Sequence, residues 1–247
     1  MCYSYTDGDQ VIANASVNFM TVLIDGKEYK GLQVGTVMTH PEYRHQGLSK
    51  KLIDHIIDKY EDNCDFIYLF ANETVLDFYP KFGFTRVPES NYFLNVNDLT
   101  EKPKKDIRKL DTENTNDFSL VKLYSKERMP VSSVLSVKNN EHLLMFYFLL
   151  AFPDSIYFLE EEETIVLFEE ENEVLHLFDV ISRKKVDLES ILNSIIFTDT
   201  EKIIFHYIPE HENIESTLIQ DEDNVLFVRS NTPFGAKQLL FPLTSHS

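Results

Sequence analysis

The residues from Val37 to Ser49 have the types and spacing needed to bind a phosphate group. A β-rich apolar run ends at His40-Pro41, a polar turn follows at Arg44-His-Gln-Gly47, and apolar residues then recur at helical spacing. This pattern predicts a strand, a tight basic turn and a helix N-terminus. The first backbone N–H groups of a helix lack partners within it, and the helix dipole adds partial positive charge there. Because Gly47 has no Cβ, a pyrophosphate could approach these groups closely.

Two motifs in this region resemble those of a known family. The spacing Arg44-x-x-Gly47-x-Ser49 resembles the Q/R-x-x-G-x-G/A acetyl-CoA loop of the GNAT N-acetyltransferase superfamily. Downstream, Phe78-Tyr-Pro-Lys-Phe-Gly-Phe84 resembles the family's F-Y-x-x-x-G-F segment. The motifs stand in the expected order with one strand between them. Ser49 departs from the usual Gly or Ala, but it is also small. The resemblance covers about residues 3–95.

The resemblance implies a set of site residues for acetyl-CoA, the co-substrate, and no metal. The pantetheine arm would pair with backbone groups of Val37, Met38 and Thr39. One N–H of these residues would polarise the thioester carbonyl. The pyrophosphate would be held by Arg44, His45, Gln46, Gly47, Leu48 and Ser49. Asn72 would contact the pantetheine amide, and Tyr79 would protonate the departing thiolate. The alternatives are a solvated turn residue for Arg44, a helix cap for Asn72 and a packing role for Tyr79.

The general base is not identified by the sequence. Proximity in sequence to the expected site gives four candidates, Glu28, His40, Glu42 and Glu73. Each is also a plausible solvated surface residue, and water relayed through backbone groups is a further alternative.

The pattern predicts an α/β (α+β) fold, and the resemblance implies a GNAT-type mixed central sheet flanked by helices over residues 1–97. Strands are expected at 1–6, 11–24, 29–39 and 66–71, a helix from about Gly47 to Tyr60, and a second helix from Glu73 to Pro80. One or two further strands are expected between Phe84 and Val96. A typical GNAT domain has a strand and two helices before the first of these strands. We therefore expect an N-terminally shortened domain, through truncation or with a partner filling the gap.

The second half is expected to form another domain. Residues 98–105 are charged and contain Pro103, which indicates a linker. From 106 to 247 the order is strand, two helices, strands, helix and strands, which resembles a second GNAT-like domain. Its helices are expected at 117–124, capped by Asn116 or Asp117, at 141–152 and after Asp187. The turn before Asp187 has no glycine and therefore no phosphate loop. The alternative is an unrelated α+β domain.

Composition limits the class of protein. The chain has 247 residues and a formal net charge of −18, which makes nucleic acid a poor partner and favours a cationic acceptor. Neither cysteine has metal-ligand spacing, no signal peptide is evident, and the apolar run 143–152 is too short to span a bilayer. We therefore expect a cytoplasmic protein that contacts neither membrane nor metal, with homo-oligomerisation left open.

Two functions remain from the sequence. The first is an N-acetyltransferase that transfers acetyl from acetyl-CoA to a primary amine of a small molecule or peptide, by direct attack in a ternary complex. The second is a non-catalytic acyl-CoA-binding or interaction protein. The loop 44–49 and Tyr79 favour the first function, and the late start of the domain favours the second.

Overall fold

The computed structural model describes residues 1–99, 107–221, 223–230 and 238–247. Four α-helices are assigned within these residues, namely α1 (Leu48–Tyr60), α2 (Thr115–Glu127), α3 (Glu141–Phe146) and α4 (Leu188–Ile195). The strands are β1 (Cys2–Asp7), β2 (Gln10–Ile24), β3 (Lys27–Thr39), β4 (Phe66–Ala71), β5 (Thr85–Arg86), β6 (Ser90–Asn95), β7 (Ile107–Lys109), β8 (Leu135–Lys138), β9 (Ile156–Leu159), β10 (Thr164–Glu171), β11 (Val174–Ser182), β12 (Lys202–Phe205), β13 (Glu215–Leu218) and β14 (Val225–Ser230).

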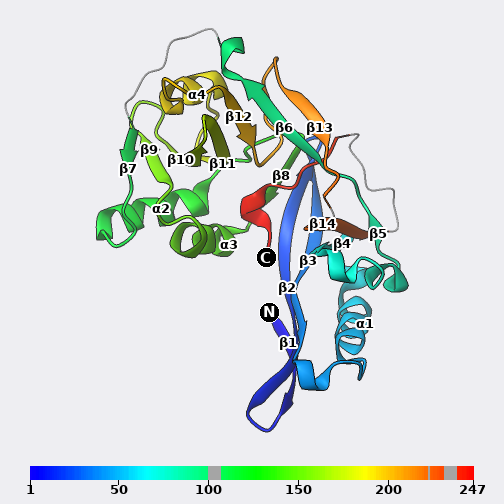
Figure 1. Cartoon of the computed structure of the whole chain (residues 1–247). Coiled ribbons are helices and arrows are strands. Elements are labelled where there is room, and N and C mark those ends of the chain that lie inside the picture. The colour runs from blue at the N-terminus through cyan, green and yellow to red at the C-terminus, as the bar shows by residue number, and fades with distance from the viewer. Residues whose placement is uncertain (100–106, 222, 231–237) are drawn as a thin grey trace.

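The described strands form two mixed seven-stranded sheets, which confirms the predicted α/β class (Figure 1). The first sheet has the order β1-β2-β3-β4-β14-β5, and β8 pairs with β2. The second has the order β13-β6-β12-β11-β10-β9-β7. In the first sheet β3 and β4 are parallel, and in the second β11 and β12 are parallel. Each parallel pair is connected through a helix, as parallel pairing requires.

Local sequence explains the first sheet. Asp25 and Gly26 both have positive φ, 49° and 76°, which is the backbone that a two-residue hairpin turn between β2 and β3 requires. Helix α1 buries one face on this sheet, because its apolar residues recur at helical spacing. The residues of that face are Leu52, Ile53, Ile56, Ile57 and Tyr60.

The two sheets share a core. Side chains of the first sheet, such as Val22 and Tyr68, are buried in one cluster with Leu177 and Phe205 of the second. Helices α2 and α3 cover the second sheet with a separate cluster that includes Val121 and Phe148. The carboxyl-terminal segment runs between the two parts (Figure 1). No helix among these described ranges is long and apolar enough to cross a membrane.

Strands cross between the two halves of the chain. Strands β8 and β14 come from the second half but lie in the first sheet, where β14 pairs with both β4 and β5. Strand β6 comes from the first half but pairs with β12 and β13 in the second sheet. The boundary expected at residues 98–105 therefore does not separate the sheets. The domain division itself stays a prediction, and residues 100–105 of the linker lie outside the described residues.

Three local predictions are wrong in detail. The helix expected from Glu73 to Pro80 is instead two short 3-10 turns, Glu73–Val75 and Tyr79–Phe82, because proline lacks the N–H that would continue a helix. The helix expected over 141–152 is α only to Phe146 and continues as a π turn, Tyr147–Ala151. The cap of α2 is Asn114, whose Oδ1 accepts from the amides of Asn116 and Asp117.

Candidate active site

The N-terminus of α1 is open to solvent. Gly47 is the N-cap residue, with φ 75°, and no side chain caps the helix there. Apart from Gly47 and its chain neighbours, no heavy atom of the described residues lies within 4 Å of the position that a Cβ on Gly47 would take. The first amide N–H groups of α1 therefore face an unobstructed surface. This arrangement can accept an anion such as a pyrophosphate.

The turn before α1 is exposed and is tied to the end of β3. Residues 44–47 are exposed, and His45 has a left-handed backbone with φ 63°. The Arg44 Nε donates weakly to the carbonyl of Thr39 at 3.4 Å, which leaves the rest of its guanidinium available to a ligand. Ser49 forms a hydrogen bond between its Oγ and the Thr39 Oγ1 at 2.7 Å. This bond joins β3 to α1. It therefore gives a structural role to Ser49, the residue that differs from the Gly or Ala usual in the family motif.

Strands β3 and β4 separate beside this turn. They pair only from Gly31↔Phe66 to Gln33↔Tyr68, although β3 continues to Thr39. On its other edge β3 stays paired with β2 up to Thr39, with a bulge opposite Ala15 at which Thr36 has φ 50°. Backbone groups of Val37, Met38 and Thr39 on the β4 side therefore have no strand partner among the residues that the structure describes. An extended ligand could pair with this edge as an added strand does.

The carboxyl-terminal segment lies at this opening, a feature that the sequence analysis missed. The Gln33 side chain donates its Nε2 to the carbonyl of Ser245 at 3.0 Å. A Cβ on Gly35 would lie 2.4 Å from the Oγ of Ser247, so only glycine fits there. The His246 ring stacks on Phe70 of β4, with centroids 3.6 Å apart. No local sequence signal could have shown contacts between residues separated by more than 170 positions.

The structure places Asn72 and Tyr79 at the next loop. The Asn72 Oδ1 accepts from the Thr74 amide at 3.1 Å, so this side chain caps the following turn, and its amide nitrogen can still donate. Tyr79 is buried against Phe78, Phe84 and Phe227, and burial raises the pKa of its phenol to about 12. The phenol is therefore protonated at neutral pH. This placement fits both a proton donor and a packing residue, and the catalytic role stays a prediction.

Comparison with known proteins identifies the first part of the chain. Residues 2–87 match the family model described as an acetyltransferase (GNAT) domain. This part of the chain is a GNAT acetyltransferase domain. The predicted resemblance is thereby confirmed over residues 3–87, and the match does not reach residues 88–95. Comparison with curated proteins gives no match.

Solved structures extend the likeness in fold beyond this GNAT domain. Eis1 from Mycobacterium abscessus is 14% identical with a TM-score of 0.59, and the alignment covers 93% of this chain and 64% of that one. A GCN5-related N-acetyltransferase from Kribbella flavida is 13% identical with a TM-score of 0.57, over 92% of this chain and 59% of that one. The chain thus spans about three fifths of the length of these structures. At such identities the likeness concerns the fold.

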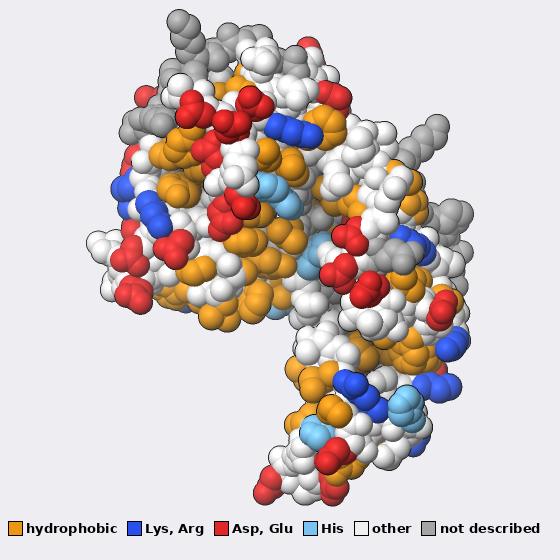
Figure 2. Space-filling view, viewed as in Figure 1, with side chains coloured by type: hydrophobic (Ala, Val, Ile, Leu, Met, Phe, Trp, Pro, Cys, Tyr) orange, Lys and Arg blue, Asp and Glu red, His pale blue; other side chains and the backbone are white. Residues whose placement is uncertain are grey.

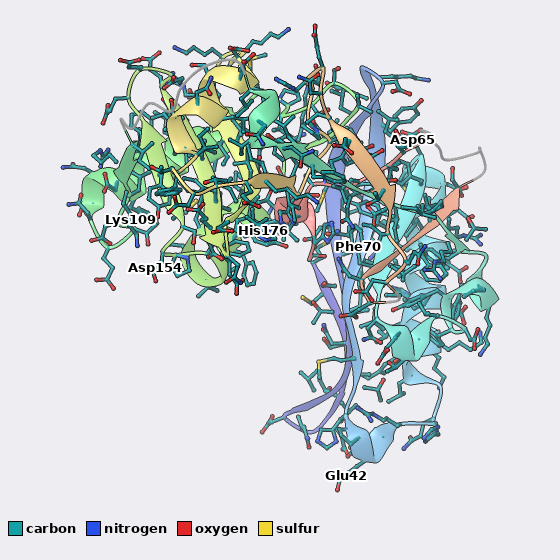
Figure 3. All side chains as sticks on the ribbon, turned by 45° about the horizontal axis from the view of Figure 1, so that its top comes forward. Glu42, Asp65, Phe70, Lys109, Asp154 and His176 are labelled. Atoms are coloured by element: carbon teal, nitrogen blue, oxygen red, sulfur yellow. The ribbon has the colours of Figure 1, made fainter. Side chains whose placement is uncertain are left out.

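The four candidates for a general base do not converge at the GNAT site. Glu28 stands at the opposite end of β3 from Met38, about 30 Å away along an extended strand, and pairs with Lys138. Glu42 is exposed in the turn before Arg44, at the lower end of the molecule in Figure 3. Glu73 is exposed on the next loop. His40 follows β3 directly, and its Nδ1 is buried without a hydrogen bond to any residue that the structure describes. Proximity in sequence was therefore a poor guide for Glu28.

Histidines and acids form no metal site among the residues described. Within the described residues, no group of three or more histidine, cysteine, aspartate or glutamate side chains could hold a metal ion. His206 contacts His176, with 3.2 Å between their ring nitrogens.

Proposed function

We propose that the chain is an N-acetyltransferase that transfers acetyl from acetyl-CoA to a primary amine. The observation that carries the proposal is the open N-terminus of α1 beside the unpaired edge of β3, within a GNAT domain. The two features match the two parts of coenzyme A that a protein backbone can hold. The pyrophosphate fits the amides after Gly47, and the pantetheine arm fits the edge at residues 37–39.

The residues have the following roles in this proposal. Arg44, His45, Gln46, Gly47, Leu48 and Ser49 surround the pyrophosphate. An N–H of residues 37–39 donates to the thioester oxygen and stabilises its negative charge as the tetrahedral intermediate forms. The ammonium first loses a proton to water, and the neutral amine nitrogen attacks the thioester carbon. The C–S bond then breaks, and the sulfur takes a proton from Tyr79. The proton that the new amide nitrogen loses returns through water to the Tyr79 phenolate. The side-chain amide of Asn72 donates a hydrogen bond to the pantetheine arm. The acceptor is small or peptidic and cationic, in keeping with the net charge of −18.

The alternative is a non-catalytic acyl-CoA-binding protein. The burial of Tyr79 favours it, because a phenol packed among three aromatic rings also has a sufficient structural role. A panel of primary amines assayed for release of free coenzyme A distinguishes the two functions. Amine-dependent release supports transfer. Tight acetyl-CoA binding without release by any amine supports the alternative.

Coenzyme A binding is tested by the substitution Gly47→Glu, measured by calorimetry. We expect the Kd to rise at least about a hundredfold, because a carboxylate would stand at the helix N-terminus in place of the pyrophosphate. The matched control is Gly26→Glu. Gly26 has φ 76° and open space around its Cβ position, as Gly47 does, but it lies at the other end of β3. The proposal is wrong if a folded Gly47→Glu variant binds as tightly as the control.

A further inference from the structure

A buried carboxyl group, which the proposed chemistry does not use, holds the carboxyl-terminal segment (residues 239–247) at the junction of the two sheets. Glu89 precedes β6 directly and is only 9% exposed. Its Oε1 accepts from the Phe241 amide at 2.8 Å. Beside this bond, the Ser90 amide donates to the carbonyl of Leu239, also at 2.8 Å. The Glu89 carboxyl is therefore the side-chain part of the attachment of this segment.

From Phe241 the segment crosses one face of the first sheet. The Phe241 ring stacks on Tyr68 of β4, with centroids 4.8 Å apart, and the His246 ring stacks on Phe70 of the same strand. Beyond His246, the segment lies against Gly35 of β3. Side chains alternate along a strand, and the other residues of β4 pack in the cluster of α1, so the segment lies on the face opposite α1. It thus forms one wall of the opening between β3 and β4.

The surroundings of Glu89 contain no cation that pairs with it. The carboxyl lines a cavity of about 340 Å³, whose other charged or titratable residues are Arg86, His206, Asp221, Asp223 and His246. Figure 2 shows acidic side chains gathered beside this junction. Among the described residues, none forms an ion pair with Glu89. Burial lowers the pKa of His206 to about 4 and that of His246 to about 3, so both rings are neutral near pH 7.

The charge of Glu89 therefore depends on whether the segment covers it. Burial raises the pKa of this carboxyl from its ordinary value of 4.5 to about 7, because nothing nearby compensates the ionised form. Where water reaches the carboxyl, its pKa returns to the ordinary value. The attached state thus binds the proton more tightly than the detached state. The contribution of Glu89 to attachment is complete below about pH 4.5, decreases as the pH rises, and is lost at about pH 7.

We propose that Glu89 is a positioning residue that holds the carboxyl-terminal segment, in a pH-dependent way, as a wall of the opening between β3 and β4. The consequence for turnover rests on the proposed acetyl transfer, whereas the attachment itself does not. The loop at residues 44–49 belongs to α1, on the other face of the sheet. The segment therefore stands on the side that is left for the amine. When it detaches, the KM for the amine should rise.

Amide hydrogen exchange of residues 239–247 in the whole chain, followed by mass spectrometry, tests the attachment without any substrate. Protection is corrected for the intrinsic pH dependence of exchange and compared with that of β11. From pH 5 to pH 8, we expect protection of the wild-type segment to fall by about tenfold or more. Glu89→Gln keeps an oxygen for the Phe241 amide and cannot ionise, so its protection should not change with pH. Glu113→Gln, an exposed change elsewhere, should behave as the wild type.

Steady-state kinetics with an amine from the panel give the second measurement. Since the amine titrates equally in both assays, the ratio of the wild-type KM to that of Glu89→Gln isolates the carboxyl. We expect this ratio to rise by about tenfold or more from pH 5 to pH 8, and the ratio of kcat values to change less. A merely structural role would not make the KM ratio depend on pH.

The outcomes separate the inference from the proposed function. Wild-type protection that does not change with pH overturns the inference, and this measurement decides alone should Glu89→Gln not fold. A pH-dependent loss that Glu89→Gln retains also overturns it. An active enzyme with a constant KM ratio overturns the positioning role. Absence of turnover with every amine counts instead against the proposed function, and hydrogen exchange still decides the attachment.

Discussion

The two parallel βαβ units of this chain have the same local structure and different chemistry at the helix N-terminus. In the first, β3 leads to α1 and β4, and Gly47 caps the helix in a left-handed conformation without a side chain. In the second, β11 leads to α4 and β12, and the Asp187 carboxylate accepts from the Ser190 amide at 3.2 Å. The second helix thus satisfies its N-terminus internally, whereas the first leaves its amides available. The capping residue decides which unit can bind an anion.

The strands show a related difference. Beyond Gln33, β3 separates from β4, and both strands continue. In the second unit, β12 ends at Phe205, and the amide of His206 donates to the carbonyl of Leu177 on β11. At the end of β11, the carbonyl of Ser182 accepts a hydrogen bond from the Met129 amide at 2.7 Å. The second unit uses its backbone groups for structure. In the first unit, β3 and β4 pair only from Gly31↔Phe66 to Gln33↔Tyr68, and the proposed function assigns the remaining edge of β3 to a ligand.

The largest expected effect is all-or-none. We predict one molecule of coenzyme A per chain, bound at the first unit, because Asp187 occupies the place that an anion would take at the second. Isothermal titration with coenzyme A measures the stoichiometry. Binding that Gly47→Glu abolishes completely supports the comparison. Two equivalent sites, or a site that survives that substitution at full affinity, would contradict it.

The next effect concerns turnover at the first unit. Tyr79→Phe keeps the ring against Phe84 and Phe227 and removes only the proton donor. If the phenol protonates the thiolate, the rate should fall by about 10²–10⁴ with an amine found in the panel, and affinity for coenzyme A should hold. Tyr207→Phe is a matched control away from this site, since Tyr207 is also buried and burial raises the pKa of its phenol. Wild-type turnover in Tyr79→Phe would assign this residue to packing.

A stability effect should dominate at the second unit. Asp179 on β11 is fully buried, and it accepts two hydrogen bonds from Arg128, at 2.7 and 2.8 Å, and one from Thr244. Asp179→Ala leaves the guanidinium buried without its partner, which should cost about 3–5 kcal/mol of unfolding free energy. Glu160→Ala breaks an exposed pair with Arg108 and should cost about 0–1 kcal/mol.

Denaturant unfolding measures both losses. Coenzyme A affinity is measured at denaturant concentrations below the unfolding transition of Asp179→Ala. Wild-type affinity in this variant would support a structural role for the second unit that is separate from ligand binding at the first. A loss for Asp179→Ala no larger than that for Glu160→Ala would show that the buried pair is not a major source of stability.

Local sequence was sufficient for one part of this comparison and not for the other. The strand, turn and helix around Gly47, and the Asp187 cap, follow from backbone chemistry within a few residues, so they could be predicted. The position of β14 between β4 and β5 could not, because a strand pattern does not encode its partner. The bond between Gln33 and Ser245 likewise joins residues 212 positions apart. The four candidates for a general base were chosen by proximity in sequence, which carries no information on such long-range contacts.

The smallest expected effect tests the second cap directly. Asp187→Ala removes the acceptor for the Ser190 amide, and α4 is only eight residues long, so the loss should be about 1 kcal/mol of unfolding free energy. Asp187→Asn keeps an oxygen at the same place and should lose only a few tenths of this, since asparagine caps nearly as well as aspartate. Denaturant unfolding of the two variants and the wild type gives the order. If alanine and asparagine have the same cost, charge at the helix dipole outweighs the hydrogen bond. If neither has a cost, the cap does not stabilise α4, and the contrast with Gly47 then rests on ligand access alone.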